Sequence, residues 1–126
     1  MARPRILLGR EIEMEGSMTD EPRKTLSDGT QIYPEHRNIV QKTGQQKGYV
    51  VLAEEERAKG FVRPVRGAYV HLKCGYETIM AQTIAETYAR DPKFYSGTFC
   101  AKCRKHFPVG EKGEFVWSGT QERVGT

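Results

Sequence analysis

Three cysteines and one histidine carry most of the chemistry in this sequence. Cys100 and Cys103 form a C-x-x-C motif, whose turn can bring two thiolates onto one metal ion. His71 and Cys74 stand upstream with the same two-residue gap. Zinc prefers thiolate sulfur and imidazole nitrogen as donors, and four of them complete a closed tetrahedral shell. The spacing therefore predicts a structural Zn²⁺ site made by His71, Cys74, Cys100 and Cys103.

The fourth ligand has an alternative. His106 follows Cys103 by three residues and competes with His71, which could instead occupy a strand position with its ring bound to a backbone carbonyl. Three cysteines cannot all pair with one another, and the cytosol keeps thiols reduced. Metal binding therefore explains the cysteines better than disulfides do, and we expect a cytoplasmic protein.

Catalytic patterns are lacking around the predicted metal site. Four protein ligands leave no open position for water or substrate. The H-x-E and H-E-x-x-H patterns of zinc enzymes are absent from the sequence, as are a Gly-rich phosphate loop and a G-x-S-x-G nucleophile. A metal-dependent nuclease is a third choice, but His106 has no acidic residue beside it. We therefore expect a non-enzymatic protein.

Two groups of basic residues could contact nucleic acid or a protein partner, because cations next to aromatic rings can hold phosphates and stack on bases. The first group surrounds Phe61 and the second surrounds the C-x-x-C turn: Arg57, Lys59, Arg63 and Arg66, then Lys102, Arg104 and Lys105. The alternative is a solvated rim over a small core of Phe107, Phe115 and Trp117. The net charge of +4 is spread along the chain, unlike the basic stripe of a dedicated nucleic-acid binder.

The 126 residues suffice for one domain, which we divide into an N-terminal arm, residues 1–47, and a metal-binding α+β domain, residues 48–126. In the arm, residues 6–15 alternate as a strand does, and Asp28-Gly29 predicts a hairpin over residues 26–32. Its few apolar residues suggest an arm that is only partly ordered alone or orders against a partner. No stretch approaches the roughly 20 apolar residues of a membrane helix, so we expect no membrane insertion.

The second segment contains the elements that must position the ligands. We expect strands at 49–52 and 67–72, a short helix at 54–59, an extended edge at 61–66 and one main helix at 76–90. A β-hairpin, 106–109 with 114–117, follows the C-x-x-C turn, and the tail from residue 118 is polar and loose. Because the helix separates the two ligand pairs, we expect a zinc-ribbon-like or treble-clef-like arrangement in permuted order.

A further signal comes from residues 54–71 and from four later segments: AETYARDPKFY (85–95), FCAKCRKHFPV (99–109), GEFVW (113–117) and ERVGT (122–126). Over about residues 48–126 the chain resembles a family of small proteins of bacteriophages and prophages, to which no activity is assigned. Its members carry a longer insert between the counterparts of His71 and Cys74. The resemblance implies a bacterial host cytoplasm and a role in supporting or interfering with host machinery.

These observations favour a non-enzymatic, zinc-stabilised accessory protein that binds a host or phage protein and inhibits a nucleic-acid-processing complex. The alternative is a zinc-finger module that binds DNA or RNA directly.

Overall fold

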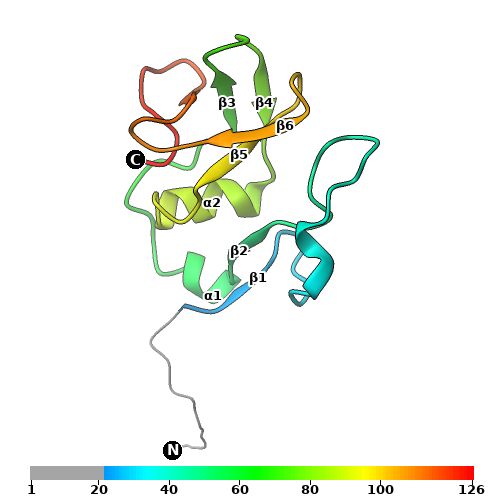
Figure 1. Cartoon of the computed structure of the whole chain (residues 1–126). Helices are drawn as coiled ribbons and strands as arrows, with labels where there is room; N and C mark the ends of the chain where they lie inside the picture. Colours follow the sequence, from blue (N-terminus) through cyan, green and yellow to red (C-terminus); the bar gives the residue numbers. More distant parts are fainter. Residues whose placement is uncertain (1–21) are drawn as a thin grey trace, which may run out of the picture.

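Short strands dominate the part of the chain that the structure describes, residues 22–126, in a computed structural model (Figure 1). They combine with two α-helices into a small α+β domain whose sheets are all antiparallel. In chain order the elements are β1 (Lys24–Leu26), the 3-10 helix η1 (Pro34–Arg37), β2 (Val50–Leu52), α1 (Glu54–Arg57), β3 (Ala68–His71), β4 (Glu77–Ile79), α2 (Gln82–Arg90), β5 (Gly97–Cys100), β6 (Lys105–Pro108) and β7 (Phe115–Trp117). The strand predicted at residues 6–15 lies outside the described residues.

A three-stranded sheet in the order β4-β3-β7 carries one wall of the core. Side chains alternate between the two faces of a strand, so Tyr69 and His71 of β3 point inward with Phe115 and Trp117 of β7. These aromatic residues pack with Tyr88 of α2 and with residues of β5 and the tail. The core is therefore largely aromatic, and it lies directly beneath the sequence-predicted ligands.

The main helix is shorter than predicted. It begins at Gln82, and residues 77–79 form β4, which pairs antiparallel with β3. Gly75 takes a positive φ of 74° in the connecting turn, a conformation that lets the chain double back on β3. Thr78 is consequently buried while Ile79 is 71% exposed. Ile84 and Tyr88, four residues apart, lie in the helix, whereas Met80 precedes it.

The hairpin predicted at residues 26–32 is wrong in its pairing. The Asp28-Gly29 turn does form, because the Thr30 backbone N–H donates to the Asp28 carboxylate at 3.0 Å and Gly29 has φ 89°. However, β1 pairs with β2, with Leu26 opposite Val50. The sheet thus joins residues from both sequence-predicted segments, 1–47 and 48–126, and buries Leu26.

The second predicted hairpin is also wrong in its pairing. The chain does turn at residues 110–113, but β6 pairs with β5 across the C-x-x-C turn, and β7 pairs with β3. The tail, predicted to be loose, packs back on this sheet: Val124 is fully buried, and its N–H donates to the Phe115 carbonyl at 3.1 Å. A single apolar residue in a polar tail is a weak sequence signal. In the structure, burial of Val124 in the core holds the tail in place.

Two connections secure the remaining segments. The short helix predicted from residue 54 is confirmed as α1, and Arg57 ties it to Glu86 of α2 at 2.5 Å. Segment 61–66 is extended but forms no strand; the backbone N–H groups of Val62 and Arg63 both point to the Ala89 carbonyl.

Among residues 22–126, no helix combines the length and apolar character needed to cross a bilayer.

The loop between η1 and β2 is fastened to the C-x-x-C turn. The guanidinium of Arg104 donates to the Lys42 carbonyl, and Gly44 lies against the Arg104 backbone. Gly44 has φ 86°, and any side chain there would collide with the Arg104 carbonyl oxygen. We call this contact the loop latch.

Candidate metal centre

The four sequence-predicted ligands come from two chain reversals. His71 ends β3 and Cys74 lies in the turn to β4, whereas Cys100 ends β5 and Cys103 lies in the turn to β6. Their ligand atoms all lie within 4.8 Å of one another. The structure therefore assembles a Cys₃His cluster from two pairs whose nearest members, Cys74 and Cys100, are 26 positions apart in the sequence.

The distances within the cluster suit a tetrahedral ion. The Sγ atoms of Cys74 and Cys100 are 3.6 Å apart, and the Cys103 Sγ is 3.6 Å from His71 Nδ1. A tetrahedral zinc with Zn–S bonds of about 2.3 Å requires a sulfur–sulfur separation of about 3.8 Å. The donor set and its spacing therefore fit, and the cluster could hold a metal ion such as zinc.

His71 is oriented by groups on three sides. Its ring is 2% exposed and is stacked between Phe107 and Phe115, with centroid distances of 4.5 and 4.8 Å. Nε2 lies 2.9 Å from Glu114 Oε1, which leaves Nδ1 facing the thiols. Carboxylates in this position fix the tautomer of metal-binding histidines and raise their basicity.

Glu114 is a functional residue that the sequence analysis missed. It precedes β7 and reaches His71 only because β3 and β7 pair, with the Leu72 N–H donating to the Glu114 carbonyl at 2.8 Å. Its carboxylate also lies 3.6 Å from Lys73 Nζ. The hydrogen bond with His71 holds the pKa of Glu114 below its usual range, with smaller contributions from Lys73. No local spacing connects residues 71 and 114.

The C-x-x-C turn directs one backbone N–H at its own sulfur and a second at a carbonyl oxygen. The Cys103 N–H points to Cys100 Sγ at 3.5 Å, and the Arg104 N–H donates to the Cys100 carbonyl at 2.7 Å. Arg104 then takes a positive φ of 59°, which is uncommon for a residue with a side chain. Such N–H groups stabilise the negative charge of thiolates around a metal.

The pKa values of two of the thiols, Cys103 and Cys74, differ widely. Desolvation raises the pKa of Cys103, and hydrogen bonds with the other two thiols add to this, to about 11. Desolvation also raises the pKa of Cys74, but it is outweighed by hydrogen bonds from the Tyr76 backbone, His71 and the neighbouring thiols, and the result is about 7. Metal binding must therefore displace protons from this cluster.

His106, the alternative ligand, lies outside the cluster. Its Nε2 is 2.7 Å from the Tyr49 hydroxyl, and its ring packs at 5.3 Å from Phe99. Desolvation lowers the pKa of His106, which favours the neutral ring. The imidazole thus belongs to the contact between β6 and the chain before β2.

Most basic side chains of the first group are engaged within the molecule. Arg57 contacts Glu86 and the Leu52 carbonyl, and Arg66 contacts Glu122 at 2.6 Å while lying over the Trp117 ring. Lys59 is 2.8 Å from Glu56, and Arg63 donates to the Thr126 carbonyl. These contacts neutralise Arg57 and Arg66, whereas Lys59 and Arg63 stay exposed.

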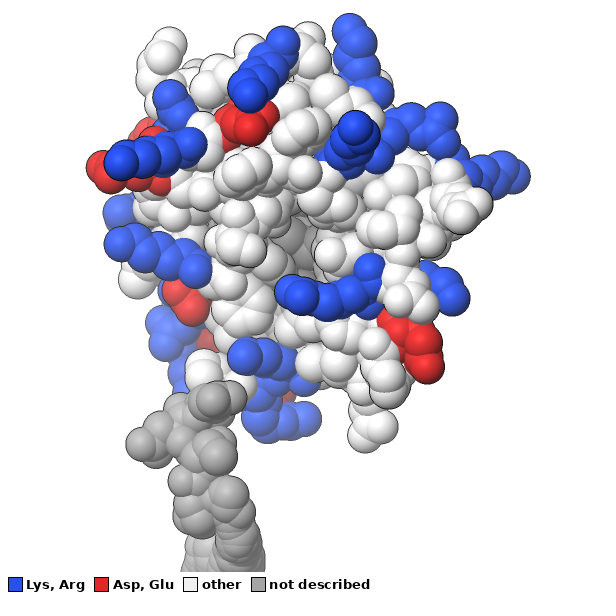
Figure 2. Space-filling model, viewed as in Figure 1, with Lys and Arg blue, Asp and Glu red and all other residues white. Residues whose placement is uncertain are grey.

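The second basic group is more open. Lys102 and Lys105 are exposed and have no ion pair within residues 22–126, whereas Arg104 is used in the loop latch. Figure 2 shows Lys and Arg side chains scattered over one face and interrupted by acidic groups, with no continuous stripe.

Comparison with known proteins gives no relative: a scan against protein families finds no match, and searches of curated proteins and of solved structures find none.

Proposed function

We propose that this protein is a zinc-stabilised, non-enzymatic binding protein in which a treble-clef-like or zinc-ribbon-like centre holds a protein-binding sheet. The closed Cys₃His set carries the first half of the proposal. Four protein donors within 4.8 Å leave no coordination position for substrate, as in structural zinc sites. The ion would link the β3–β4 turn to the β5–β6 turn and so hold two sheets together.

The outer face of the β4-β3-β7 sheet carries the second half. Its apolar side chains are half-exposed or exposed: Ala68, Val70, Leu72, Ile79 and Val116; Glu77, opposite Val70, adds a charge to the same face. Ala68 pairs with Ile79 and Val70 with Val116, so these residues are contiguous. Contiguous apolar surface on a small domain is typical of a protein-binding site. We call these five residues the apolar sheet face.

The electrostatics support a protein partner over direct nucleic-acid binding. Arg57 and Arg66 are already neutralised by carboxylates, and a carboxylate-paired guanidinium gains little from a phosphate. The resemblance to phage proteins extends the proposal to a host or phage protein in the bacterial cytoplasm, such as a subunit of a nucleic-acid-processing complex. Binding of such a partner should depend weakly on salt, whereas phosphate contacts would make affinity fall steeply with salt.

Metal content tests the first half. We expect one zinc per chain, and a Cys103→Ser variant that loses both the metal and its cooperative unfolding transition, because metal binding contributes folding free energy. Elemental analysis and circular dichroism would measure the two losses. A well-folded, metal-free Cys103→Ser protein would contradict the structural role.

Capture from a bacterial host lysate tests the second half. Leu72→Lys places a charge on the apolar sheet face, and we expect it to abolish capture of a specific protein at unchanged zinc content. Ile32→Lys is the matched control, because Ile32 is similarly exposed, 43% against 49%, but lies outside this face. Equal capture by both variants would remove the sheet face from the proposal.

A further inference from the structure

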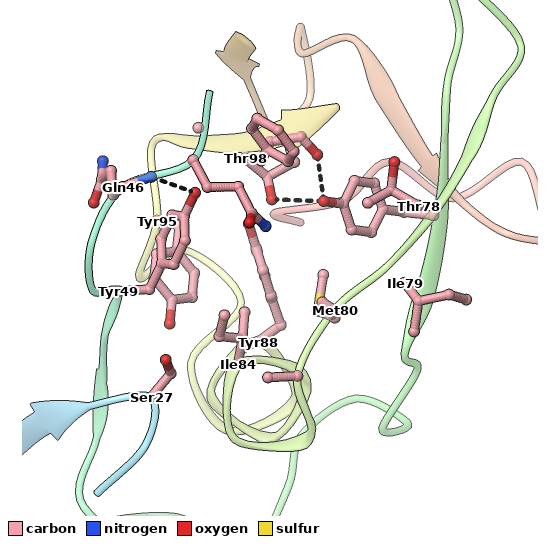
Figure 3. Close-up of a pocket in the computed structure, with 15 residues that line it drawn as sticks. Ser27, Gln46, Tyr49, Thr78, Ile79, Met80, Ile84, Tyr88, Tyr95 and Thr98 are labelled. Atoms are coloured by element: carbon pink, nitrogen blue, oxygen red, sulfur yellow. Dashed lines mark hydrogen bonds between the residues drawn. The ribbon is translucent and has the colours of Figure 1, made fainter. Parts of the chain in front are cut away.

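An aromatic cavity lies between α2, β4 and β5, and none of the four candidate ligands lines it (Figure 3). Its volume is about 300 Å³, near the lower end of the range for small-ligand sites, ~300–1,000 Å³. The rings of Tyr49, Tyr69, Tyr88 and Tyr95 line it, and Gln45 and Gln46 close one side. A flat molecule could therefore contact both the aromatic rings and the polar groups of the glutamines there.

One of the four tyrosine hydroxyls lacks a partner. Tyr69 donates to the Phe99 carbonyl, Tyr95 donates to the Val50 carbonyl at 2.7 Å, and the Tyr49 hydroxyl is 2.7 Å from His106 Nε2. The Tyr88 residue is only 3% exposed, and its buried hydroxyl makes no hydrogen bond within the described chain. Figure 3 shows Tyr88 reaching from α2 into the cavity. A buried hydroxyl without a partner costs stability, so this one points to a missing ligand group.

The cavity lining selects an uncharged ligand. No Asp, Glu, Lys, Arg or His occurs among the described residues that line it. Desolvation raises the pKa of Tyr88, so its hydroxyl stays protonated and can donate. Glutamine amides offer a donor and an acceptor side by side, the pattern that pairs with the edge of a nucleobase. Aromatic walls with such edges favour a planar heteroaromatic ring.

A second cavity adjoins the first and has a different charge. It measures about 270 Å³ and shares Tyr49 and Tyr95 with the first cavity. Arg37 brings a positive charge to its lining, beside His36 and the neutral ring of His106, and no carboxylate lines it within residues 22–126. The His36 Nδ1 atom is also buried without a hydrogen-bond partner in the described chain. An anionic group would be stabilised there, beside the tyrosines that the two cavities share.

We propose that the two cavities together bind one nucleotide unit, with the base beside Tyr88 and the phosphate beside Arg37. Figure 2 shows that the face containing α2 and β5 is hollowed near its centre, with a basic side chain along one edge of the hollow and mostly uncharged residues around the rest. The unit is either a free nucleotide or one residue of a single-stranded nucleic acid, since both present the same chemistry. This site is independent of the apolar sheet face.

Calorimetric titration of the zinc-loaded chain tests the proposal with four probes: nucleosides, nucleoside monophosphates, a single-stranded 12-mer and its duplex. We expect Tyr88→Phe to weaken binding of nucleosides and monophosphates alike, by about fivefold, the value of one neutral hydrogen bond. Arg37→Gln should weaken monophosphates by about tenfold or more but leave nucleosides unchanged. Lys112→Gln, which removes the same charge from a residue that lines neither cavity, should change neither.

The probes also identify the source of the ligand. Tighter binding of the 12-mer than of monophosphates would indicate single-stranded nucleic acid, and the reverse order would indicate a free nucleotide. Three results would overturn the proposal: no binding of any probe at millimolar concentration, equal affinity for an abasic 12-mer, or affinities that Tyr88→Phe and Arg37→Gln leave unchanged. Both variants alter polar groups without creating cavities, so the protein should remain folded.

Discussion

The Glu114 carboxylate accepts a hydrogen bond from Nε2 of His71 at 2.9 Å, on the side of the ring opposite the Cys103 thiol. The contact fixes which imidazole nitrogen is available as a ligand. It also explains why a fully buried histidine can sit among aromatic rings, since both of its nitrogen atoms have partners.

Glu114→Gln should therefore weaken zinc binding while keeping the fold at saturating zinc. Loss of such an outer-shell partner typically lowers metal affinity by about 10–100-fold. Competition with a chromophoric chelator would measure the change. Glu111→Gln, an exposed substitution in the neighbouring turn, should have the affinity of the unmodified protein; an equal loss in both would mean that overall charge, rather than the contact with His71, sets the affinity.

Tyr88→Phe and Tyr95→Phe form a matched pair for stability. Both remove one hydroxyl from the same aromatic cluster, where the rings are 4.7 Å apart. Tyr95→Phe should lower the free energy of unfolding by about 1 kcal/mol, because the Val50 carbonyl loses its donor. Tyr88→Phe removes a hydroxyl without a partner and should leave stability unchanged or raise it. Urea unfolding of both variants would show the difference, and equal losses would contradict it.

The lowered pKa of Glu86 should make the stability of the folded protein depend on pH in the acid range. Hydrogen bonds from Gln82 and then from Arg57 lower the pKa of Glu86 in the folded protein. A lowered folded-state pKa gives stability that is present above the unfolded value of 4.5 and is lost as the pH falls through the folded value.

Glu86→Gln should therefore cost about 1–2 kcal/mol at neutral pH, since a hydrogen-bonded charge is removed from the α1–α2 contact. The difference from the unmodified protein should shrink as the pH falls below 4.5 and through the lower pKa of the folded state. Chemical unfolding at a series of pH values measures this, with the exposed Glu54→Gln as control. A difference that stays constant down to acid pH would show that the carboxylate charge is not involved.

Gly44→Ala tests the loop latch against Gly29→Ala. Both glycines have φ near 90°, and alanine there costs about 1–2 kcal/mol. Only Gly44 lies against another segment, the Arg104 backbone, whereas nothing lies near Gly29. The collision should add about 1–3 kcal/mol to the loss of stability at Gly44. Thermal unfolding compares them, and equal losses would mean that the latch contributes nothing.

The sequence predicted the ligands better than the elements that carry them. Ligand chemistry is local, since C-x-x-C and His-x-x-Cys each fit one turn, and the count of donors restricts how the turns can meet. Strand pairing is not local. Residues 77–79 lie next to helix α2 in the sequence but form a strand. Their pairing with β3, which the local sequence does not reveal, determines this conformation. Likewise, Glu114 and Val124 acquire their roles through β7, whose partner lies more than 40 residues away.

The loop latch gives the metal centre an influence beyond its own ligands. Arg104 directly follows Cys103, and the loop it holds continues from Gly44 into Gln45 and Gln46 at the mouth of the tyrosine-lined cavity. Withdrawing zinc would free the Cys103 turn, slacken the latch and move the glutamines. Loss of the ion would then disturb the cavity together with the ligand turns, so that ligand recognition and folding would depend on the same ion.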